Sequence, residues 1–192
     1  MINRELYMEQ ITPFIDKPFV KVITGIRRCG KSVVLRLIRE ELLRRGVSED
    51  YIIYMNFESF EWIDMKEAKA LYAHIREATK ASGKYYILLD EIQEVTDWEK
   101  AVNAFLVDLD VDIYVTGSNS RLLSSEFSTY LAGRYVAFHI MTLSFREYLL
   151  FHDLPLTISV SDRKTEFLKY LRMGGFPAIH TANYDYNAIY KI

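Results

Sequence analysis

The sequence predicts an α/β fold in which helices cover both faces of a parallel sheet, giving three layers. Five short apolar runs alternate along the chain with segments of helical periodicity, the pattern of repeated strand–helix–strand units. The runs are apolar at nearly every position, as expected for strands that are buried on both faces. Ligands of such sheets bind beyond the carboxyl ends of the strands, so residues at those ends are the first candidates for a functional site.

The expected strands are short and rich in branched and aromatic residues. Three of them end at residues suited to a functional site, namely Gly25, Asp90 and Gly117. In chain order, the expected strands are residues 19–24, 51–57, 85–90, 112–117 and 135–140.

The helices between the strands are expected from apolar residues at helical spacing. The first runs from Lys31 to Arg45, and Gly46 is expected to end it. The later helices are expected to begin at residues that cap a first turn. These residues are Asp64 or Glu67, Asp97 and Ser120.

Length and composition describe a globular chain. It has 192 residues, of which 50% are hydrophobic and 26% charged, with a net charge of -2. It contains no apolar run near the roughly 20 residues that cross a bilayer, and its first residues do not resemble a signal peptide. Its single cysteine, Cys29, cannot pair within the chain. We therefore expect a cytoplasmic protein with no membrane partner.

The stretch "GIRRCGKS" (25–32) fits the pattern G-x-x-x-x-G-K-[ST] at every fixed position. Its glycines let backbone N–H groups converge on a phosphate, and the positive end of the following helix faces the same anion. Lys31 would reach the β- and γ-phosphates and act in both binding and catalysis, while the Ser32 hydroxyl would bind Mg²⁺. The expected nucleotide contacts are Gly25, Ile26, Arg27, Arg28, Cys29, Gly30, Lys31, Ser32 and Val33.

Three side chains of this loop have open roles. Cys29 lies beside a helix N-terminus and cationic residues, which would lower the pKa of its thiol and make it reactive. Alternatively, it is a small residue at a free loop position. Arg27 and Arg28 would touch phosphate, contact a neighbouring subunit or lie in solvent.

Two carboxylates follow the most strand-like segment, "YYILLD". Asp90 is suited to hold the Mg²⁺ with its water shell next to Ser32. Glu91 would then orient and polarise the attacking water. An adjacent acidic pair is otherwise a solvated turn, but the phosphate loop favours the functional interpretation.

Two further residues are candidates for contacts with the γ-phosphate. In "VTGSNS", Asn119, or failing it Ser118, would bridge the γ-phosphate and the water; the alternative is that Asn119 serves only the turn. Arg134, in "LAGRY", would act as an arginine finger, often presented by a neighbouring subunit. Its alternative is a surface ion pair.

At this point the chain resembles a family, the bacterial and archaeal AAA-type ATPases that carry an uncharacterised C-terminal domain. The resemblance rests on "VITGIRRCGKS", "YYILLDEIQ", "VTGSNS", "LAGRYV", "TLSFREYL" and "GGFP" in this order. It implies a P-loop NTPase fold of the additional-strand, catalytic-glutamate type, with strand order 5-1-4-3-2. It also implies Asp90 and Glu91 as the metal-site and catalytic pair, Asn119 as the γ-phosphate sensor and Arg134 as the finger.

The resemblance also gives expectations for the end of the chain. Pro177 of "GGFP" would pack on the adenine ring; the alternative is an ordinary turn before a further helix. Family members continue into the rest of a helical lid and a nuclease-like C-terminal domain. We therefore expect a truncated protein, with the ATPase domain at 1–145 and the start of the lid, leading to the missing domain, at 146–192.

The expected function is Mg²⁺-dependent ATP binding and hydrolysis that drives a conformational change in an attached module. The alternative is a slow, nucleotide-gated switch that binds ATP with little turnover. Glu91 argues against a small-molecule kinase, and the absence of Asn-Lys-x-Asp after the fourth strand argues against guanine. A homo-oligomer, and a nucleic-acid or protein partner bound through the missing domain, remain open.

Overall fold

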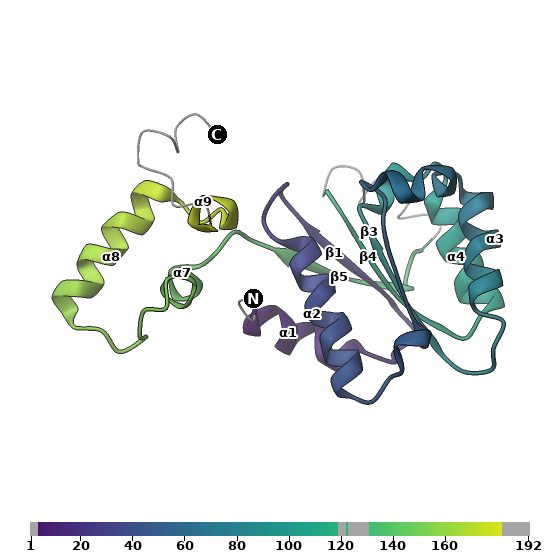
Figure 1. Ribbon diagram of the computed structural model, residues 1–192, viewed down its shortest axis with the longest axis horizontal. Helices are drawn as coiled ribbons and strands as arrows, with labels where there is room; N and C mark the ends of the chain where they lie inside the picture. Colours follow the sequence, from purple (N-terminus) through teal and green to yellow (C-terminus); the bar gives the residue numbers. More distant parts are fainter. Residues whose placement is uncertain (1–3, 119–121, 123–130, 182–192) are drawn as a thin grey trace.

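The structure is a computed structural model that describes residues 4–118, 122 and 131–181 of the chain. It contains a five-stranded, all-parallel sheet of order β2-β3-β4-β1-β5 (Figure 1). This confirms the expected fold class and strand order, and each strand lies within one residue of its expected position. The strands are β1 (Val20–Gly25), β2 (Ile52–Asn56), β3 (Tyr85–Asp90), β4 (Val111–Gly117) and β5 (Tyr135–Ile140).

Helices cover both faces of the sheet and make the three expected layers (Figure 1). On one face, α1 (Glu5–Ile11) and α2 (Lys31–Arg44) pack on apolar residues of β1, β3, β4 and β5. On the other, α3 (Ala68–Ala78) and α4 (Trp98–Asp108) enclose a second core. Short 3-10 helices connect these elements: η1 (Thr12–Phe14), η2 (Glu49–Tyr51), η3 (Phe60–Met65) and η4 (Ile92–Glu94).

The helix boundaries agree with the sequence at α2 and differ at α3 and α4. Gly46 follows the end of α2 with a left-handed φ of 88°, as expected of a helix stop. Before α3, η3 intervenes, so this helix begins at Ala68 rather than near Asp64. Asp97 does not cap α4: its side chain accepts from Lys100 Nζ (2.8 Å) and from no backbone N–H of the first turn. The helix expected after Ser120 lies outside the described residues.

Three further helices follow β5: α7 (Phe145–Phe151), α8 (Val160–Met173) and α9 (Pro177–Thr181). They lie to one side of the sheet (Figure 1). For brevity, α7, α8 and α9 are together called the lid below. Aromatic side chains join α7 to α8, with ring centroids of Phe145 and Phe167 5.1 Å apart and those of Tyr148 and Tyr170 5.5 Å apart. Among the described helices, none is both long enough and apolar enough to cross a membrane.

A buried ion pair joins the two central strands near their amino ends. Lys21 of β1 donates to Asp112 of β4 and to the Lys17 carbonyl (2.9 Å), and its side chain is fully buried. The second Asp112 oxygen accepts from the Tyr114 hydroxyl (2.8 Å) and from the Asp16 N–H (2.8 Å). Burial lowers the pKa of Lys21, while the charge of Asp112 opposes this. Breaking the Lys21–Asp112 pair would therefore leave buried polar atoms of this network without their hydrogen-bond partners.

Asp112→Asn is expected to lower the free energy of unfolding by about 3–5 kcal/mol, because it leaves the buried Lys21 charge without its counter-ion. Urea unfolding measures this. The control is Lys80→Gln, which breaks an exposed pair with Glu77 and should cost less than about 1 kcal/mol. Adding Lys21→Met to Asp112→Asn should recover part of the loss. Equal losses for Asp112→Asn and the control would contradict the prediction.

Candidate nucleotide-binding site

The phosphate loop follows β1 at the carboxyl edge of the sheet, and its glycines are required by the backbone. A Cβ on Gly25 would stand 2.4 Å from the Ile140 carbonyl oxygen, so β1 and β5 approach each other too closely here for any side chain. Gly30 has a left-handed φ of 104° directly before the first residue of α2. These constraints fix the loop between the end of a buried strand and the N-terminus of a helix.

Cys29 is a core residue, and neither of its expected roles is correct as stated. Its side chain is fully buried in the core between the sheet and helices α1 and α2, with Sγ 2.7 Å from where a Gly25 Cβ would stand. Burial raises the pKa of its thiol, so the position does not favour a reactive thiolate. The position is not free either, because its side chain is part of this core.

Lys31 and Glu91 contact each other. Lys31 is 4% exposed, and its Nζ lies 3.4 Å from Glu91 Oε1 and 3.4 Å from the Ile26 carbonyl oxygen, to which it donates. Glu91 follows the last residue of β3 and has a left-handed φ of 55°, which turns the chain sharply at the strand end. The parallel sheet thus brings the loop lysine to the second of the two carboxylates.

Asp90 is fully buried and held by two hydroxyl groups that the sequence did not reveal. Thr116 Oγ1 donates to Asp90 Oδ1 (2.5 Å), and the Tyr54 hydroxyl donates to Asp90 Oδ2 (3.0 Å). Thr116 Oγ1 also accepts from the Glu91 N–H (2.9 Å). Burial raises the pKa of Tyr54, and the charge of Asp90 adds to this, which keeps the hydroxyl a donor. One threonine therefore fixes both acidic residues.

Gln93 is a second residue that sequence reasoning missed. Its Nε2 donates to Glu91 Oε2 (2.5 Å), so both oxygens of Glu91 have cationic or amide partners. Its own Oε1 is buried and, within the described part of the chain, has no hydrogen-bond partner. A Cβ on Gly117 would stand 2.1 Å from that oxygen, so the glycine at the end of β4 makes room for the amide.

These groups surround a hollow of about 270 Å³. It is lined by Arg27, Lys31, Glu58, Glu91, Gln93, Glu94 and Ser118. Arg27 lies on its exposed rim, where its guanidinium is 3.7 Å from the Glu58 carboxylate. Ser118 faces the same hollow, while Asn119 lies outside the described residues. The hollow therefore gathers the loop lysine with groups from the ends of β3 and β4.

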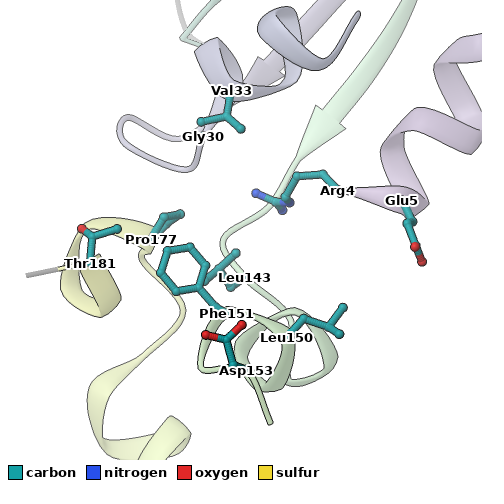
Figure 2. Close-up of a pocket in the computed structure, with 10 residues that line it drawn as sticks. All are labelled: Arg4, Glu5, Gly30, Val33, Leu143, Leu150, Phe151, Asp153, Pro177 and Thr181. Atoms are coloured by element: carbon teal, nitrogen blue, oxygen red, sulfur yellow. The ribbon is translucent and has the colours of Figure 1, made fainter. Parts of the chain in front are cut away.

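A larger pocket of about 650 Å³ lies on the other side of the loop, between α2 and the lid (Figure 2). Gly30 and Val33 line it from the loop side, and Leu143, Phe151 and Pro177 line it from the lid side. Pro177 is the first residue of α9, and the Gly175 carbonyl accepts from the Leu143 N–H (2.7 Å). The "GGFP" segment thus carries Pro177 to the same pocket as two residues of the loop.

Arg134 is not near the phosphate loop of its own chain. It precedes β5, and its carbonyl oxygen accepts from the N–H of Val20, the first residue of β1. The loop begins at the opposite end of β1, roughly 17 Å farther along at strand spacing. The exposed Arg134 side chain donates to Asn103 Oδ1 of α4 (3.1 Å). Within its own chain, Arg134 therefore lies away from the phosphate loop.

The sheet order, the glycine-rich loop after β1 and the acidic pair after β3 together define a P-loop NTPase fold. Residues 17–149 match the AAA domain family, and the chain belongs to that family. It is 43% identical over 184 residues to an uncharacterized protein of Haemophilus influenzae, and 35% identical over 184 residues to one of Methanocaldococcus jannaschii. The alignments include 95% and 93% of this chain but only 46% and 39% of those relatives, so the chain spans less than half of their length.

Solved structures with similar folds come from other proteins of low sequence identity. AMPPCP-bound DnaA of Aquifex aeolicus aligns with a TM-score of 0.59 at 15% identity, covering 94% of this chain and 60% of that one. ORC1 of Aeropyrum pernix, in complex with DNA, aligns with a TM-score of 0.50 at 17% identity, covering 86% and 50%. At these identities the similarity concerns the fold.

Thr116→Val is expected to destabilise the chain by about 1–3 kcal/mol, because it leaves the buried Asp90 oxygen and the Glu91 N–H without their shared partner. Nucleotide turnover should fall as well, since both acidic residues lose their fixed position. Thr165→Val is the control, because that hydroxyl donates to the Ser161 carbonyl on an exposed helix. Urea unfolding and turnover assays measure the two effects. Equal behaviour of the two variants would contradict the role of Thr116.

Proposed function

We propose that this AAA domain binds ATP with Mg²⁺, hydrolyses it, and thereby drives a conformational change in an attached module. One observation carries the proposal: the phosphate-loop lysine lies 3.4 Å from the carboxylate that follows β3, within one hollow. A catalytic carboxylate must stand beside the terminal phosphate to activate water there, and Lys31 is the residue expected to hold that phosphate.

The phosphates would bind at the loop between β1 and α2. Backbone N–H groups of residues 25–33 and the positive end of α2 attract the anion. The buried Lys31 ammonium adds a full charge, and ATP would separate it from Glu91 by taking its place as the partner. Arg27, exposed at the rim of the hollow, is free to turn toward the terminal phosphate because its Glu58 contact is a weak surface pair.

Ser32 and Asp90 fit a magnesium site. They offer a hydroxyl and a carboxylate oxygen, the hard ligands that Mg²⁺ prefers, and the hydroxyls of Thr116 and Tyr54 hold the Asp90 carboxylate in one orientation. When bound, Mg²⁺ would neutralise phosphate charge during transfer. Asp90 would act through the water shell of the ion, and Ser32 directly.

Glu91 would accept a proton from the attacking water. For this its carboxylate must exchange at least one of its present partners, Lys31 or Gln93, for the water. Asn119, or Ser118 on the rim of the hollow, would bridge the water and the γ-phosphate. The adenine of ATP would bind in the pocket between α2 and the lid, which Val33 and Pro177 line.

The partners of Glu91 favour a second candidate function, a slow nucleotide-gated switch. Both of its oxygens are engaged, one by Lys31 and the other by Gln93 at 2.5 Å. Breaking a short, partly buried hydrogen bond before each turnover would slow hydrolysis without weakening ATP binding. The two candidates share their residues and differ in the rate at which Glu91 is released.

We place the ATPase domain at 1–145 and the start of the lid at 146–192; the attached module corresponds to the additional length of the relatives. A nucleic-acid partner is consistent with the DNA-bound ORC1 fold neighbour, but such a partner would act through that module. On α2 the basic face is partly neutralised, since Glu41 binds both Arg44 and Arg45 at 2.8 Å and its charge offsets one of theirs. These arginines lower the pKa of Glu41 to about 2.

Glu91→Gln is expected to reduce Mg²⁺-dependent ATP turnover by roughly 10²–10⁴-fold, because the amide cannot take a proton from water. ATP affinity should persist, since the loop is intact. A phosphate-release assay and equilibrium titration measure the two quantities. Glu77→Gln, which removes an exposed glutamate at the end of α3, is the control. Tight ATP binding without turnover in the wild type would favour the switch, and absence of ATP binding would refute both candidates.

Because Arg134 lies too far from its own loop, wild-type turnover per chain is expected to rise with protein concentration. Arg134→Ala is expected to abolish this turnover. Mixing Arg134→Ala with Glu91→Gln should restore part of the activity, since a site is intact where the Arg134→Ala chain supplies Glu91 and the Glu91→Gln chain supplies Arg134. Asn103→Ala is the matched control, because it removes the same internal hydrogen bond and keeps the arginine. Turnover per chain that is independent of concentration, or no recovery on mixing, would contradict the finger.

A further inference from the structure

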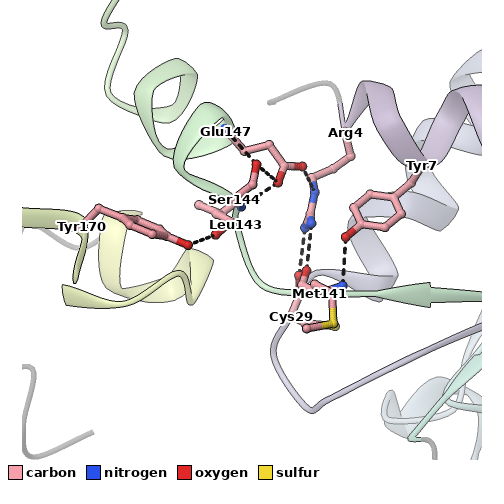
Figure 3. Close-up of polar contacts among 8 residues, drawn as sticks. All are labelled: Arg4, Tyr7, Cys29, Met141, Leu143, Ser144, Glu147 and Tyr170. Atoms are coloured by element: carbon pink, nitrogen blue, oxygen red, sulfur yellow. Dashed lines mark hydrogen bonds and ion pairs between the residues drawn. The ribbon is translucent and has the colours of Figure 1, made fainter. Parts of the chain in front are cut away.

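Arg4 is a buried cation beside the phosphate loop to which the proposed function assigns no role. It precedes α1 and is only 2% exposed. A buried guanidinium is stable only when its N–H groups and its charge are matched by partners. The partners of Arg4 belong to two parts of the chain that are far from it in the sequence, the phosphate loop and residues 141–147 (Figure 3).

One contact reaches the phosphate loop. Arg4 Nη1 donates to the Cys29 carbonyl oxygen (3.0 Å), and a Cβ on Gly30 would stand 3.3 Å from the same nitrogen. A peptide unit is planar and trans, so the Cys29 carbonyl and the Gly30 N–H point in opposite directions. By holding that carbonyl, Arg4 fixes the direction of the Gly30 N–H, one of the groups available to a phosphate.

The other contacts reach the lid. Arg4 Nη2 donates to the Met141 carbonyl (2.8 Å), just after β5, and Nε donates to Glu147 Oε1 (2.6 Å) in the first turn of α7. The second oxygen of Glu147 accepts from both the N–H and the hydroxyl of Ser144 (2.8 Å each), which completes the capping box of α7. The start of α7 is therefore bound to the same guanidinium as the loop.

Arg4 also lines the pocket proposed to bind the adenine of ATP. It lines that pocket together with Gly30 and Val33 from the loop and with Leu143 and Pro177 from the lid (Figure 2). Its guanidinium lies 4.7 Å from the ring centroid of Tyr7, whose hydroxyl accepts from the Met141 N–H (3.0 Å). The Tyr7 ring thus packs against the guanidinium, and its hydroxyl binds Met141, the residue whose carbonyl Arg4 also binds.

We propose that Arg4 is a positioning residue that couples nucleotide binding at the phosphate loop to the docking of α7. The inference rests on the proposed function, because it assumes that the loop binds a nucleotide. A nucleotide that orders the Cys29–Gly30 peptide also orders Arg4, and Arg4 holds Glu147 by a charge-assisted hydrogen bond. Occupancy of the loop is thereby transmitted to the first turn of the lid through two side chains.

The test uses AMPPCP with Mg²⁺ as the probe and compares the wild type with Arg4→Lys and Glu147→Gln. Hydrogen exchange is followed in residues 25–33 and 145–151, and affinity is measured by calorimetry. In the wild type, AMPPCP should slow exchange in both segments. Arg4→Lys keeps the charge but cannot make all three contacts, so affinity should fall by roughly 10-fold or more. Slowing in 145–151 should disappear, while some remains in 25–33 at saturating AMPPCP.

Glu147→Gln separates the coupling from the loop contact. It keeps the Arg4 contact with Cys29, so affinity should fall less than in Arg4→Lys, but slowing in 145–151 should again be lost. Arg146→Gln is the matched control: it breaks an exposed pair with Glu5 (3.7 Å) that joins the same two helices, and it should behave as wild type. If Arg4→Lys does not fold, Glu147→Gln decides by itself.

The outcomes distinguish the two proposals. If AMPPCP does not bind the wild type, the proposed function fails and the coupling fails with it. If AMPPCP binds and slows exchange in 25–33 only, nucleotide binding at the loop is supported and the coupling is overturned. Slowing in 145–151 that persists in the folded Arg4→Lys and Glu147→Gln variants would also overturn it, because α7 would then sense the nucleotide by another route.

Discussion

The site depends on the parallel hydrogen bonding of the sheet. Parallel strands require a crossover after each strand, so every carboxyl end lies on one edge. Because β4 lies between β1 and β3, Thr116 stands next to Asp90 and Glu91, and the phosphate loop on the far side of β4 can reach Glu91 through Lys31. Side chains from three distant parts of the chain, at residues 31, 90–91 and 116, thus converge at one place.

The two ends of the parallel strands, here called the carboxyl and amino edges of the sheet, carry different kinds of residues. At the carboxyl edge, close backbone approaches and a left-handed Glu91 hold groups in strained or desolvated positions suited to chemistry. Toward the amino edge, Lys21, Asp112, Tyr114 and Asp16 form a satisfied buried network that joins the two central strands. Arg134 also lies toward this edge, where its exposed side chain donates to Asn103.

The sequence was sufficient for the strands, the loop and the acidic pair, because each is a local pattern of apolar runs, glycines and charges. It failed at Asp97, where the side chain binds Lys100 rather than the helix start, and at Cys29, whose side chain lies in the core between the sheet and helices α1 and α2. Arg4, Thr116 and Gln93 have their roles through tertiary contacts that no local pattern encodes. The capping box at Ser144 and Glu147 was readable as S-x-x-E.

Cys29 is the only cysteine of the chain; it belongs to the phosphate loop, and its side chain is fully buried. An alkylating reagent can reach it only when the loop lifts away from β5 and α1. The rate of modification of the unaltered protein therefore counts loop-opening events, and a ligand that closes the loop would slow it. The chain carries its own chemical reporter at the centre of the site, with no engineered label needed.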